Sequence, residues 1–240
     1  MTGYILCATP RSGSTLLCSL LRSSGVAGHP ESWFRRQDRA DWARDWAILR
    51  GDGGFDWDVY LQAAMAAGTG SNRVFGLRLM WNTLGELVAD LAGPAVGEQA
   101  ALLARCFGPL RFIHLSRHDL VAQAVSRHRA EMSGIWHLGI EAGKHPPEPT
   151  YDFGRIEGYL RAAEADNAGW DIWFAANGIS PLRVSYEDLS ADPVAVAQGV
   201  LADLGLVAAK PMQSRVRKMA DAVNEGWALR FRTEAGRRAG

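Results

Sequence analysis

The chain has 240 residues, of which 48% are hydrophobic and 22% charged, so it can bury one substantial core and is not a disordered protein. Lysine plus arginine and aspartate plus glutamate number 26 each, and the zero net charge gives no support for binding nucleic acid or an anionic membrane surface. Any site for an anion must therefore be local.

The cysteines and the N-terminal sequence indicate a cytoplasmic protein. The three cysteines, Cys7, Cys18 and Cys106, contain no C-x-x-C pair, and an odd number favours a reducing compartment. The first residues lead directly into an apolar run, without the basic start and long apolar stretch of a signal peptide. No run approaches the roughly 20 apolar residues that cross a bilayer. We expect one domain over residues 1–240, with a frayed tail from about residue 233.

Apolar runs of strand length alternate with segments of helical spacing along the chain. Strands are predicted at 4–8, 74–79, 111–116 and 182–185, and helices at 14–21, 38–50, 57–67, 98–107, 119–132, 152–176 and 193–204. The proline-rich stretch 139–150 cannot continue a helix and is predicted as a loop. Alternating strands and helices indicate an α/β fold with a central parallel sheet flanked by helices.

The sequence P-R-S-G-S-T, residues 10–15, lies between the first predicted strand and the first predicted helix. A helix start offers an anion unpaired backbone N–H groups and the positive end of the helix dipole. Gly13 lets the backbone approach an anion closely, and Arg11 supplies a planar, permanent positive charge. Further donors are the hydroxyl groups of Ser12, Ser14 and Thr15. The segment is a candidate phosphate or sulfate site, and a serine-capped helix after a turn is the alternative.

A nucleotide triphosphatase is the nearest competing interpretation, because its phosphate loop also joins a strand to a helix. That loop has the pattern G-x-x-x-x-G-K-[ST], in which the lysine reaches the terminal phosphates and the last residue holds magnesium. Here the lysine and the first glycine are absent, and no acidic metal ligand is evident after a later strand. We therefore expect an anion site that works without a metal.

A second candidate anion element follows the third predicted strand. Arg117 stands at the end of that strand, and Asp119 can cap the helix that carries Ser126. Because ligands bind at the carboxyl ends of strands in open α/β folds, Arg117 is expected at the ligand-binding edge. Arg117 and Ser126 can hold one phosphate from two directions, and a solvated arginine with a surface serine is the alternative.

The pairing of these two elements resembles the sulfotransferases that use 3'-phosphoadenosine-5'-phosphosulfate (PAPS) as their donor. Further segments resemble the mycobacterial trehalose 2-sulfotransferase family, namely 25–34 (GVAGHPESWF), 79–82 (LMWN), 123–126 (QAVS) and 169–174 (GWDIWF). The resemblance runs from about residue 4 to residue 232 and therefore covers nearly the whole chain. It implies the P-loop-like sulfotransferase fold, which is related to that of nucleotide kinases.

The resemblance also implies which residues bind the donor. Residues 11–15 would hold the 5'-phosphosulfate, and Arg117 with Ser126 would hold the 3'-phosphate that distinguishes PAPS from ordinary adenosine nucleotides. Arg11 is expected to act in catalysis as well, because positive groups stabilise the charge that develops on the transferred oxygens. Trp173 and a closing segment that includes Lys218 are candidates for covering the nucleotide.

Sulfuryl transfer needs an acceptor hydroxyl in line with the sulfur and a base for its proton. By the resemblance, Glu31 is the candidate base. The family pattern has its base directly before the aromatic pair, where this chain has Ser32, so trehalose and another small hydroxyl compound both stay open as acceptors. His29 and His118 are alternative bases, because imidazole titrates near neutral pH. The residues expected to line the acceptor pocket are Glu31, Trp33, Phe34, Met80, Trp81, Asn82 and Gln123.

Three functions remain open at this point. The first is transfer of a sulfuryl group from PAPS to a carbohydrate or another small hydroxyl compound, releasing adenosine 3',5'-bisphosphate. The second is a phosphotransferase or nucleotide triphosphatase with an altered loop, for which magnesium-dependent ATP turnover is the test. The third is a nucleotide-binding protein that has lost catalysis. Related trehalose enzymes form dimers whose partners complete one another's acceptor sites, so the resemblance implies a homodimer.

Overall fold

Four parallel strands form the centre of the molecule. The computed structural model describes residues 2–91, 98–136, 149–214 and 222–239. Within these, the sheet has the spatial order β2-β1-β3-β4 and consists of β1 (Thr2–Ala8), β2 (Val74–Met80), β3 (Leu110–Ser116) and β4 (Leu182–Ser185). All three pairings are parallel, and Ala8 lies in register with Met80 and Leu115. The carboxyl ends of these strands therefore meet at one edge, and the predicted parallel α/β sheet is confirmed.

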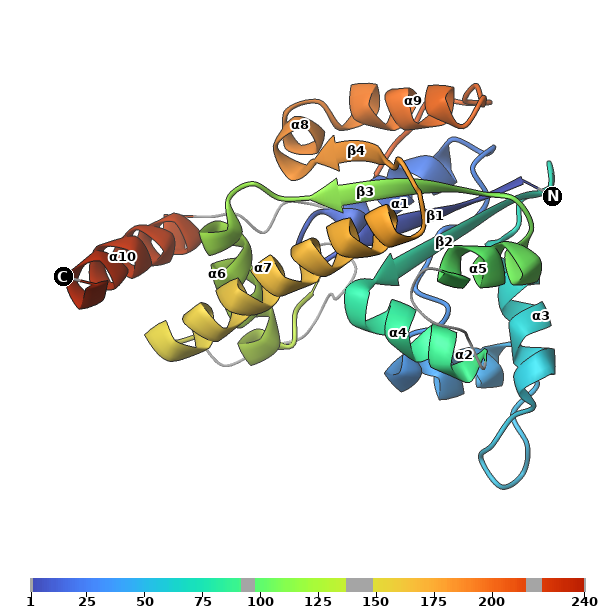
Figure 1. Cartoon of the computed structure of the whole chain (residues 1–240), viewed down its shortest axis with the longest axis horizontal. Helices are drawn as coiled ribbons and strands as arrows, with labels where there is room; N and C mark the ends of the chain where they lie inside the picture. Colours follow the sequence, from blue (N-terminus) through green and yellow to red (C-terminus); the bar gives the residue numbers. More distant parts are fainter. Residues whose placement is uncertain (1, 92–97, 137–148, 215–221, 240) are drawn as a thin grey trace.

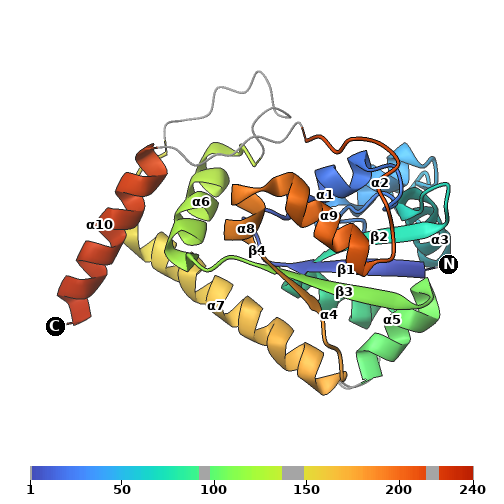
Figure 2. The ribbon, with the colours of Figure 1, turned by 90° about the horizontal axis from the view of Figure 1, so that it is seen from above.

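Helices cover both faces of the sheet (Figure 1, Figure 2). One face carries α1 (Ser14–Ser23) and α9 (Pro193–Asp203), joined to the sheet by α8 (Tyr186–Ala191). The other face carries α4 (Trp81–Asp90), α5 (Gln99–Phe107) and α7 (Phe153–Ala176), and beside β2 lie α2 (Arg39–Asp45) and α3 (Trp57–Gly68). Beyond the carboxyl ends of the strands stand α6 (Leu120–Ser133) and α10 (Ala222–Ala239), as Figure 1 shows.

The side chains of β1 divide the hydrophobic core between the two faces. Successive residues of a strand point to opposite sides, and Tyr4 and Leu6 accordingly enter the core under α1 and α9. Ile5 and Cys7 enter the other core, under α4, α5 and α7. All four side chains are at most 1% exposed, and burial of a large apolar side chain contributes roughly 1.5–3 kcal/mol. The strand is therefore fixed from both sides, and the loop that follows it starts from a rigid position.

Several boundaries differ from the predictions. The predicted helix 38–50 is a 3₁₀ turn, η1 (Arg36–Asp38), followed by α2, which ends at Asp45, and Ala47 takes a left-handed φ of 57° that a helix cannot continue through. Helices α4, α8 and α10 are absent from the predicted set. A frayed tail was expected from residue 233, but α10 continues to Ala239. Within this stretch, Glu234 accepts hydrogen bonds from Arg230 and Tyr151. Most of the predicted loop 139–150 lies outside the described residues.

No helix among the described residues has both the length and the apolar content needed to cross a bilayer.

Candidate active site

The loop between β1 and α1 bends sharply where the carboxyl edge of the sheet begins. Arg11 and Gly13 both take left-handed backbone conformations, with φ of 67° and 91°, and Gly13 caps α1. Such turns curve successive backbone N–H groups around an anion. A left-handed non-glycine residue costs about 1 kcal/mol, and strain of this kind gathers at functional sites. The backbone itself is therefore shaped as an anion site.

Two buried side chains fix this loop from inside. The amide of Gln123, on α6, donates hydrogen bonds to Thr9 Oγ1 at 2.8 Å and to the Pro10 carbonyl at 2.7 Å. The Ser12 hydroxyl donates to the Thr9 carbonyl at 2.8 Å. Both side chains are at most 1% exposed. The side chains of Ser12 and Gln123, which were predicted to contact the donor and the acceptor, instead bond the loop and do not line the groove.

Arg117 and Tyr186 close the loop on the β3–β4 side. The guanidinium carbon of Arg117 lies 4.2 Å from the centre of the Tyr186 ring, a cation–π contact. A Cβ atom on Gly13 would lie only 2.8 Å from a Tyr186 ring carbon, so a glycine is needed for the ring to rest against the loop. Burial lowers the pKa of Arg117, and its buried Nε has no hydrogen-bond partner in the part of the chain that is described. A partly buried cation of this kind suits an anionic ligand.

The two predicted anion elements meet in space. Arg11 Nε donates a hydrogen bond to Ser126 Oγ at 3.0 Å, although the two residues are 115 positions apart. Arg11 also donates to the backbone carbonyl of Trp136. Ser126 comes from α6 and Arg117 from the end of β3, so the loop, β3 and α6 converge on one place.

A groove of about 1170 Å³ runs along this edge of the sheet. Its volume exceeds the 300–1,000 Å³ of a typical ligand pocket, so two small molecules can be held side by side. One end lies at the β3–β4 side, where Tyr186, Ser190 and Pro193 line it, and the other extends past β2. Six arginines line it, Arg11, Arg35, Arg78, Arg117, Arg127 and Arg232, against four acidic residues, Asp119, Glu131, Asp166 and Glu225. The local positive charge that the neutral composition requires of any anion site is therefore present here.

Arg78 joins the loop to the segment that carries Glu31. It projects from β2, and its Nη1 donates to Thr15 Oγ1 at 2.8 Å while its Nε donates to Ser32 Oγ at 2.8 Å. Its Nη2 donates to Glu31 Oε1. Arg22 approaches the other oxygen of Glu31 at 3.4 Å from the exposed side. The carboxylate is thus fixed next to the loop between β1 and α1, which we call the phosphate loop after its predicted role.

Residues 3–234 of the chain match the family model described as Stf0 sulphotransferase. The chain belongs to this family. Two curated relatives agree: trehalose 2-sulfotransferases of Mycobacterium tuberculosis and Mycolicibacterium smegmatis are each 31% identical, over 98% of this chain and 96% of the relative. The crystal structure of a sulfotransferase from Alicyclobacillus acidocaldarius aligns with a TM-score of 0.50 and 14% identity, covering 99% of this chain and 94% of that one. That likeness shows the fold, and the protein is an enzyme of the sulfotransferase class.

Most predicted donor residues of this sulfotransferase line the groove. They are Arg11, Gly13, Ser14, Thr15, Arg117 and Ser126. Of the predicted acceptor residues, Met80 and Asn82 line it at the end of β2 and the start of α4. Lys218 lies outside the described residues.

The predictions for Trp33 and Phe34 are corrected, because both side chains belong to the hydrophobic core. Trp33 is 6% exposed, packs 4.8 Å from the Trp42 ring centre and donates its indole N–H to the His29 carbonyl at 3.2 Å. Phe34 is fully buried against Phe107. Both side chains pack into the core and hold their own loop segment in place. Neither lines the groove in this arrangement.

The predictions for Trp81 and Trp173 are corrected for the same reason. Trp81 packs between α4 and α7, where a Cβ at Gly169 would lie 2.4 Å from its indole ring. It also contacts Trp170, with ring centres 5.3 Å apart. Trp173 is 1% exposed and donates its indole N–H to Gln99 Oε1 at 2.8 Å. It lies in the core under the sheet and does not line the groove.

The three candidate bases occupy different environments. Glu31 is 25% exposed and does not itself line the groove, but its partners Arg78 and Ser32 do. His118 is 73% exposed, and its ring lies 3.4 Å from Glu187. Burial, followed by the charge of Arg22, lowers the pKa of His29 below the ordinary value, yet its side chain does not line the groove.

Sequence reasoning missed Arg78 and Tyr186. Arg78 is a single charge inside the apolar run V-F-G-L-R-L-M, and a charge in a buried strand needs a partner or a ligand. That signal was available in the sequence. Tyr186 directly follows the last strand, and nothing in its neighbourhood reveals that its ring reaches Gly13.

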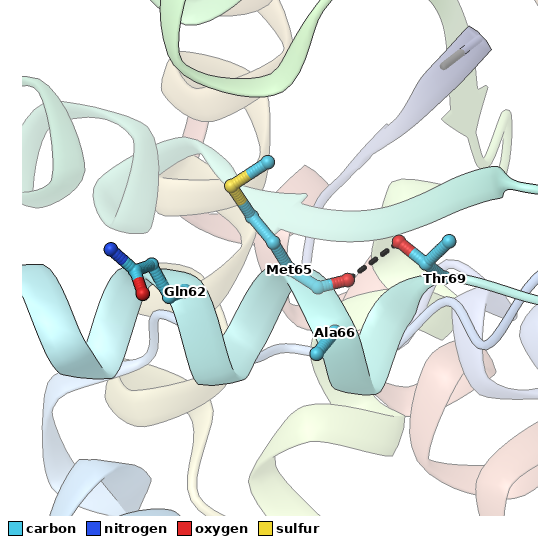
Figure 3. A pocket seen from close by; sticks show the side chains of 4 residues that line it. All are labelled: Gln62, Met65, Ala66 and Thr69. Carbon is cyan, nitrogen blue, oxygen red and sulfur yellow. Dashed lines mark hydrogen bonds between the residues drawn. The ribbon is translucent and has the colours of Figure 1, made fainter.

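A second, shallower hollow of about 400 Å³ lies on α3 (Figure 3). Its lining consists of Gln62, Met65, Ala66 and Thr69, and the Thr69 hydroxyl donates to the Met65 carbonyl at 2.6 Å. These four residues carry no charge, so this hollow is a poor candidate for an anionic donor. No group of three or more histidine, cysteine, aspartate or glutamate side chains among the described residues is placed to hold a metal ion.

Proposed function

We propose that this sulfotransferase takes the sulfuryl group from PAPS and transfers it directly to a hydroxyl of a sugar, with trehalose as the first acceptor to test. Two relatives named trehalose 2-sulfotransferase, similar over nearly the whole chain, support the acceptor. The groove supports a donor and an acceptor held together, because it is large enough for both.

The observation that carries the donor proposal is the partly buried cation of Arg117. Its Nε is buried without a hydrogen-bond partner among the described residues, and it faces the same groove as Ser126 and Arg11. A second phosphate on the ribose would supply the missing anion. The left-handed loop at residues 11–13 and the start of α1 would hold the 5'-phosphosulfate through backbone N–H groups. Both parts of the chain thus fit a nucleotide with phosphate at its two ends.

In the proposed reaction, the acceptor oxygen forms a bond to sulfur while the bond between sulfur and the bridging phosphate oxygen breaks. The acceptor proton goes to Glu31, and adenosine 3',5'-bisphosphate leaves. Arg11 and the loop N–H groups stabilise the charge that develops on the transferred and leaving oxygens. The position of Glu31 supports its assignment as the base, because it lies beside the loop and the β2 side of the groove. Arg78 orients one of its carboxylate oxygens there.

The test uses PAPS and trehalose with the wild-type enzyme and a Glu31→Gln variant. Mass spectrometry is expected to detect one added sulfuryl group on trehalose and an equal amount of adenosine 3',5'-bisphosphate. Loss of a general base lowers kcat by roughly 10²- to 10⁴-fold, while affinity for adenosine 3',5'-bisphosphate should stay the same. A fully active variant would remove Glu31 from the mechanism. Magnesium-dependent turnover of ATP without sulfuryl transfer would instead favour the phosphotransferase.

We also propose that the enzyme is a cytoplasmic homodimer. The dimer rests on the resemblance to the trehalose enzymes, and the compartment on the cysteine content of the sequence. Sedimentation at micromolar concentration distinguishes a dimer from a monomer.

A further inference from the structure

Several charged residues that line the groove have no role in the proposed reaction. Two of them are Asp166, on α7, and Arg127, on α6. The phosphate loop stands in the middle of the sheet edge, after β1, and Arg117 and Tyr186 mark the β3–β4 side as the nucleotide side. What lies past β1 toward β2 is therefore on the acceptor side.

Helix packing places Asp166 on that acceptor side. Gly169, one turn later on the same face of α7, is the residue on which Trp81 packs, and Trp81 directly follows β2. Arg127 stands one turn after Gln123, whose amide holds the Pro10 carbonyl. The two side chains therefore come from the helices that flank the loop and the end of β2.

Asp166 has no partner that accounts for its burial. It makes no hydrogen bond and no ion pair within the described ranges 2–91, 98–136, 149–214 and 222–239. Burial raises its pKa above the ordinary value, and the charge of Arg127 only partly opposes this. A half-buried carboxylate that no protein group satisfies carries an uncompensated desolvation penalty. Such a penalty is retained where a ligand supplies the missing hydrogen bonds.

Arg127, like Asp166, is partly buried without a full set of hydrogen-bond partners among the described residues. Its side chain is 26% exposed, and its guanidinium lies 4.9 Å from the centre of the Tyr159 ring. Its buried Nε has no hydrogen-bond partner in the described part of the chain, and the nearest carboxylate, of Glu131, is 3.9 Å away. The stacking fixes the plane of the guanidinium, and the residue lines the groove.

We infer that Asp166 and Arg127 form a subsite for the hydroxyl groups of the sugar acceptor, which they hold in place for attack on the donor. The carboxylate accepts hydrogen bonds from neighbouring hydroxyls, and the guanidinium donates to their oxygens. A diol presents both functions, so a polyhydroxy acceptor fits this pair better than a lone alcohol does. The inference rests on the proposed function, since it names the part of that site which binds the acceptor.

The test compares Asp166→Asn with Glu164→Gln, a control at an exposed position of the same helix. Trehalose is titrated into the protein in the presence of adenosine 3',5'-bisphosphate, and the KM for trehalose is measured with PAPS. Asp166→Asn is expected to raise the dissociation constant of trehalose and its KM by about tenfold, the effect of losing a charge-assisted hydrogen bond. Glu164→Gln is expected to change neither constant. Affinity for adenosine 3',5'-bisphosphate should stay within about twofold, which assigns the subsite to the acceptor.

A thermal readout separates this role from a structural one. Because the Asp166 charge destabilises the free protein, Asp166→Asn should raise the melting temperature, whereas loss of a structural contact would lower it. Monodeoxy trehaloses that lack the recognised hydroxyl should bind both proteins equally.

The outcomes are distinguishable. An unchanged trehalose KM in Asp166→Asn, with sulfuryl transfer intact, would overturn the subsite and leave the proposed function standing. Weakened trehalose binding without any transfer from PAPS would overturn the proposed function and keep the subsite. Weakened binding of adenosine 3',5'-bisphosphate would assign Asp166 to the donor, and the absence of trehalose binding to the wild-type protein would also overturn the inference.

Discussion

Arg78 connects the loop between β1 and α1 to the segment that carries Glu31. Its three nitrogens donate to Thr15 in the phosphate loop, to Ser32 and to Glu31, and its side chain is only 12% exposed. Because each bond goes to a different residue, this one side chain links Glu31 and Ser32 to the loop between β1 and α1. Charge-assisted hydrogen bonds in such a partly buried setting are stronger than neutral ones.

Replacing Arg78 is therefore expected to impair catalysis more than binding. In Arg78→Gln, the Glu31 carboxylate loses its buried partner and its orientation, and kcat should fall about 10²-fold, the effect of misplacing a catalytic group. The dissociation constant of adenosine 3',5'-bisphosphate should rise by less than about tenfold, since a single contact through Thr15 is lost. Steady-state kinetics and calorimetry measure the two effects.

Arg22→Gln serves as the matched control for Arg78→Gln. Arg22 touches the same carboxylate at 3.4 Å, but its side chain is 45% exposed, and exposed ion pairs contribute about 0–1 kcal/mol. Its kcat should stay within a few-fold of the wild type. Equal losses in the two variants would mean that Arg78 has no special place in the site.

Residues whose roles depend on local sequence could be predicted, and those that depend on packing could not. The place of Arg11, Gly13 and Thr15 in the groove lining follows from a strand, a loop and a helix start within one stretch of chain. Trp33 and Trp173 are aromatic residues that suit a pocket and a core equally well, and only the arrangement of the helices decides between the two. In this protein both belong to the core.

Among the helices, the start of α6 is coupled to α10 through Asp119. Its carboxylate accepts a hydrogen bond from the Ala122 N–H at 2.9 Å, which caps α6, and another from Arg232 of α10 at 2.7 Å. Burial raises the pKa of Asp119, but the hydrogen bonds from Ala122 and Arg232 together lower it by more. The pKa in the folded protein therefore lies below the ordinary value. The ionised carboxylate therefore stabilises the folded protein.

The stabilisation by Asp119 should depend on pH. With a folded-state pKa below 3.8, the contribution is complete above the unfolded-state pKa and is lost as the pH falls below about 3.8. Asp119→Ala is expected to lower the free energy of unfolding by about 1 kcal/mol at pH 7, the size of an N-cap effect, since solvent screens the exposed pair with Arg232. Urea unfolding at pH 7 and pH 3 measures this, and a difference that grows on acidification would contradict it.

Among the secondary-structure elements, too, those with a distinctive local sequence were predicted and those that depend on packing were missed. The four strands were predicted within two residues at each end, because buried apolar runs between turns are distinctive. Helix α4 was missed because Met80, Trp81 and Asn82 suggested a pocket, although Trp81 begins a helix that packs on α7. Helix α10 was missed because its few apolar residues, among them Trp227 and Phe231, show a weak helical pattern in a mostly polar segment.

For the molecule as a whole, function depends on how a neutral chain concentrates positive charge. The chain carries 26 basic and 26 acidic residues, yet six arginines and only four acidic residues line one groove. The sheet order β2-β1-β3-β4 divides that groove, with Tyr186 and Arg117 on one side of the loop and Asn82 and Asp166 on the other. Two reactants can therefore meet over the end of β1.

The central claim is that this groove takes an adenosine nucleotide with a 3'-phosphate, and calorimetric titration tests it most directly. Adenosine 3',5'-bisphosphate is titrated into the wild-type protein and into Arg117→Ala, with adenosine 5'-monophosphate as the control ligand. We predict that the bisphosphate binds much more tightly than the monophosphate, and that Arg117→Ala weakens the bisphosphate alone by about 10- to 100-fold. Equal affinities for the two nucleotides in the wild-type protein would contradict the account.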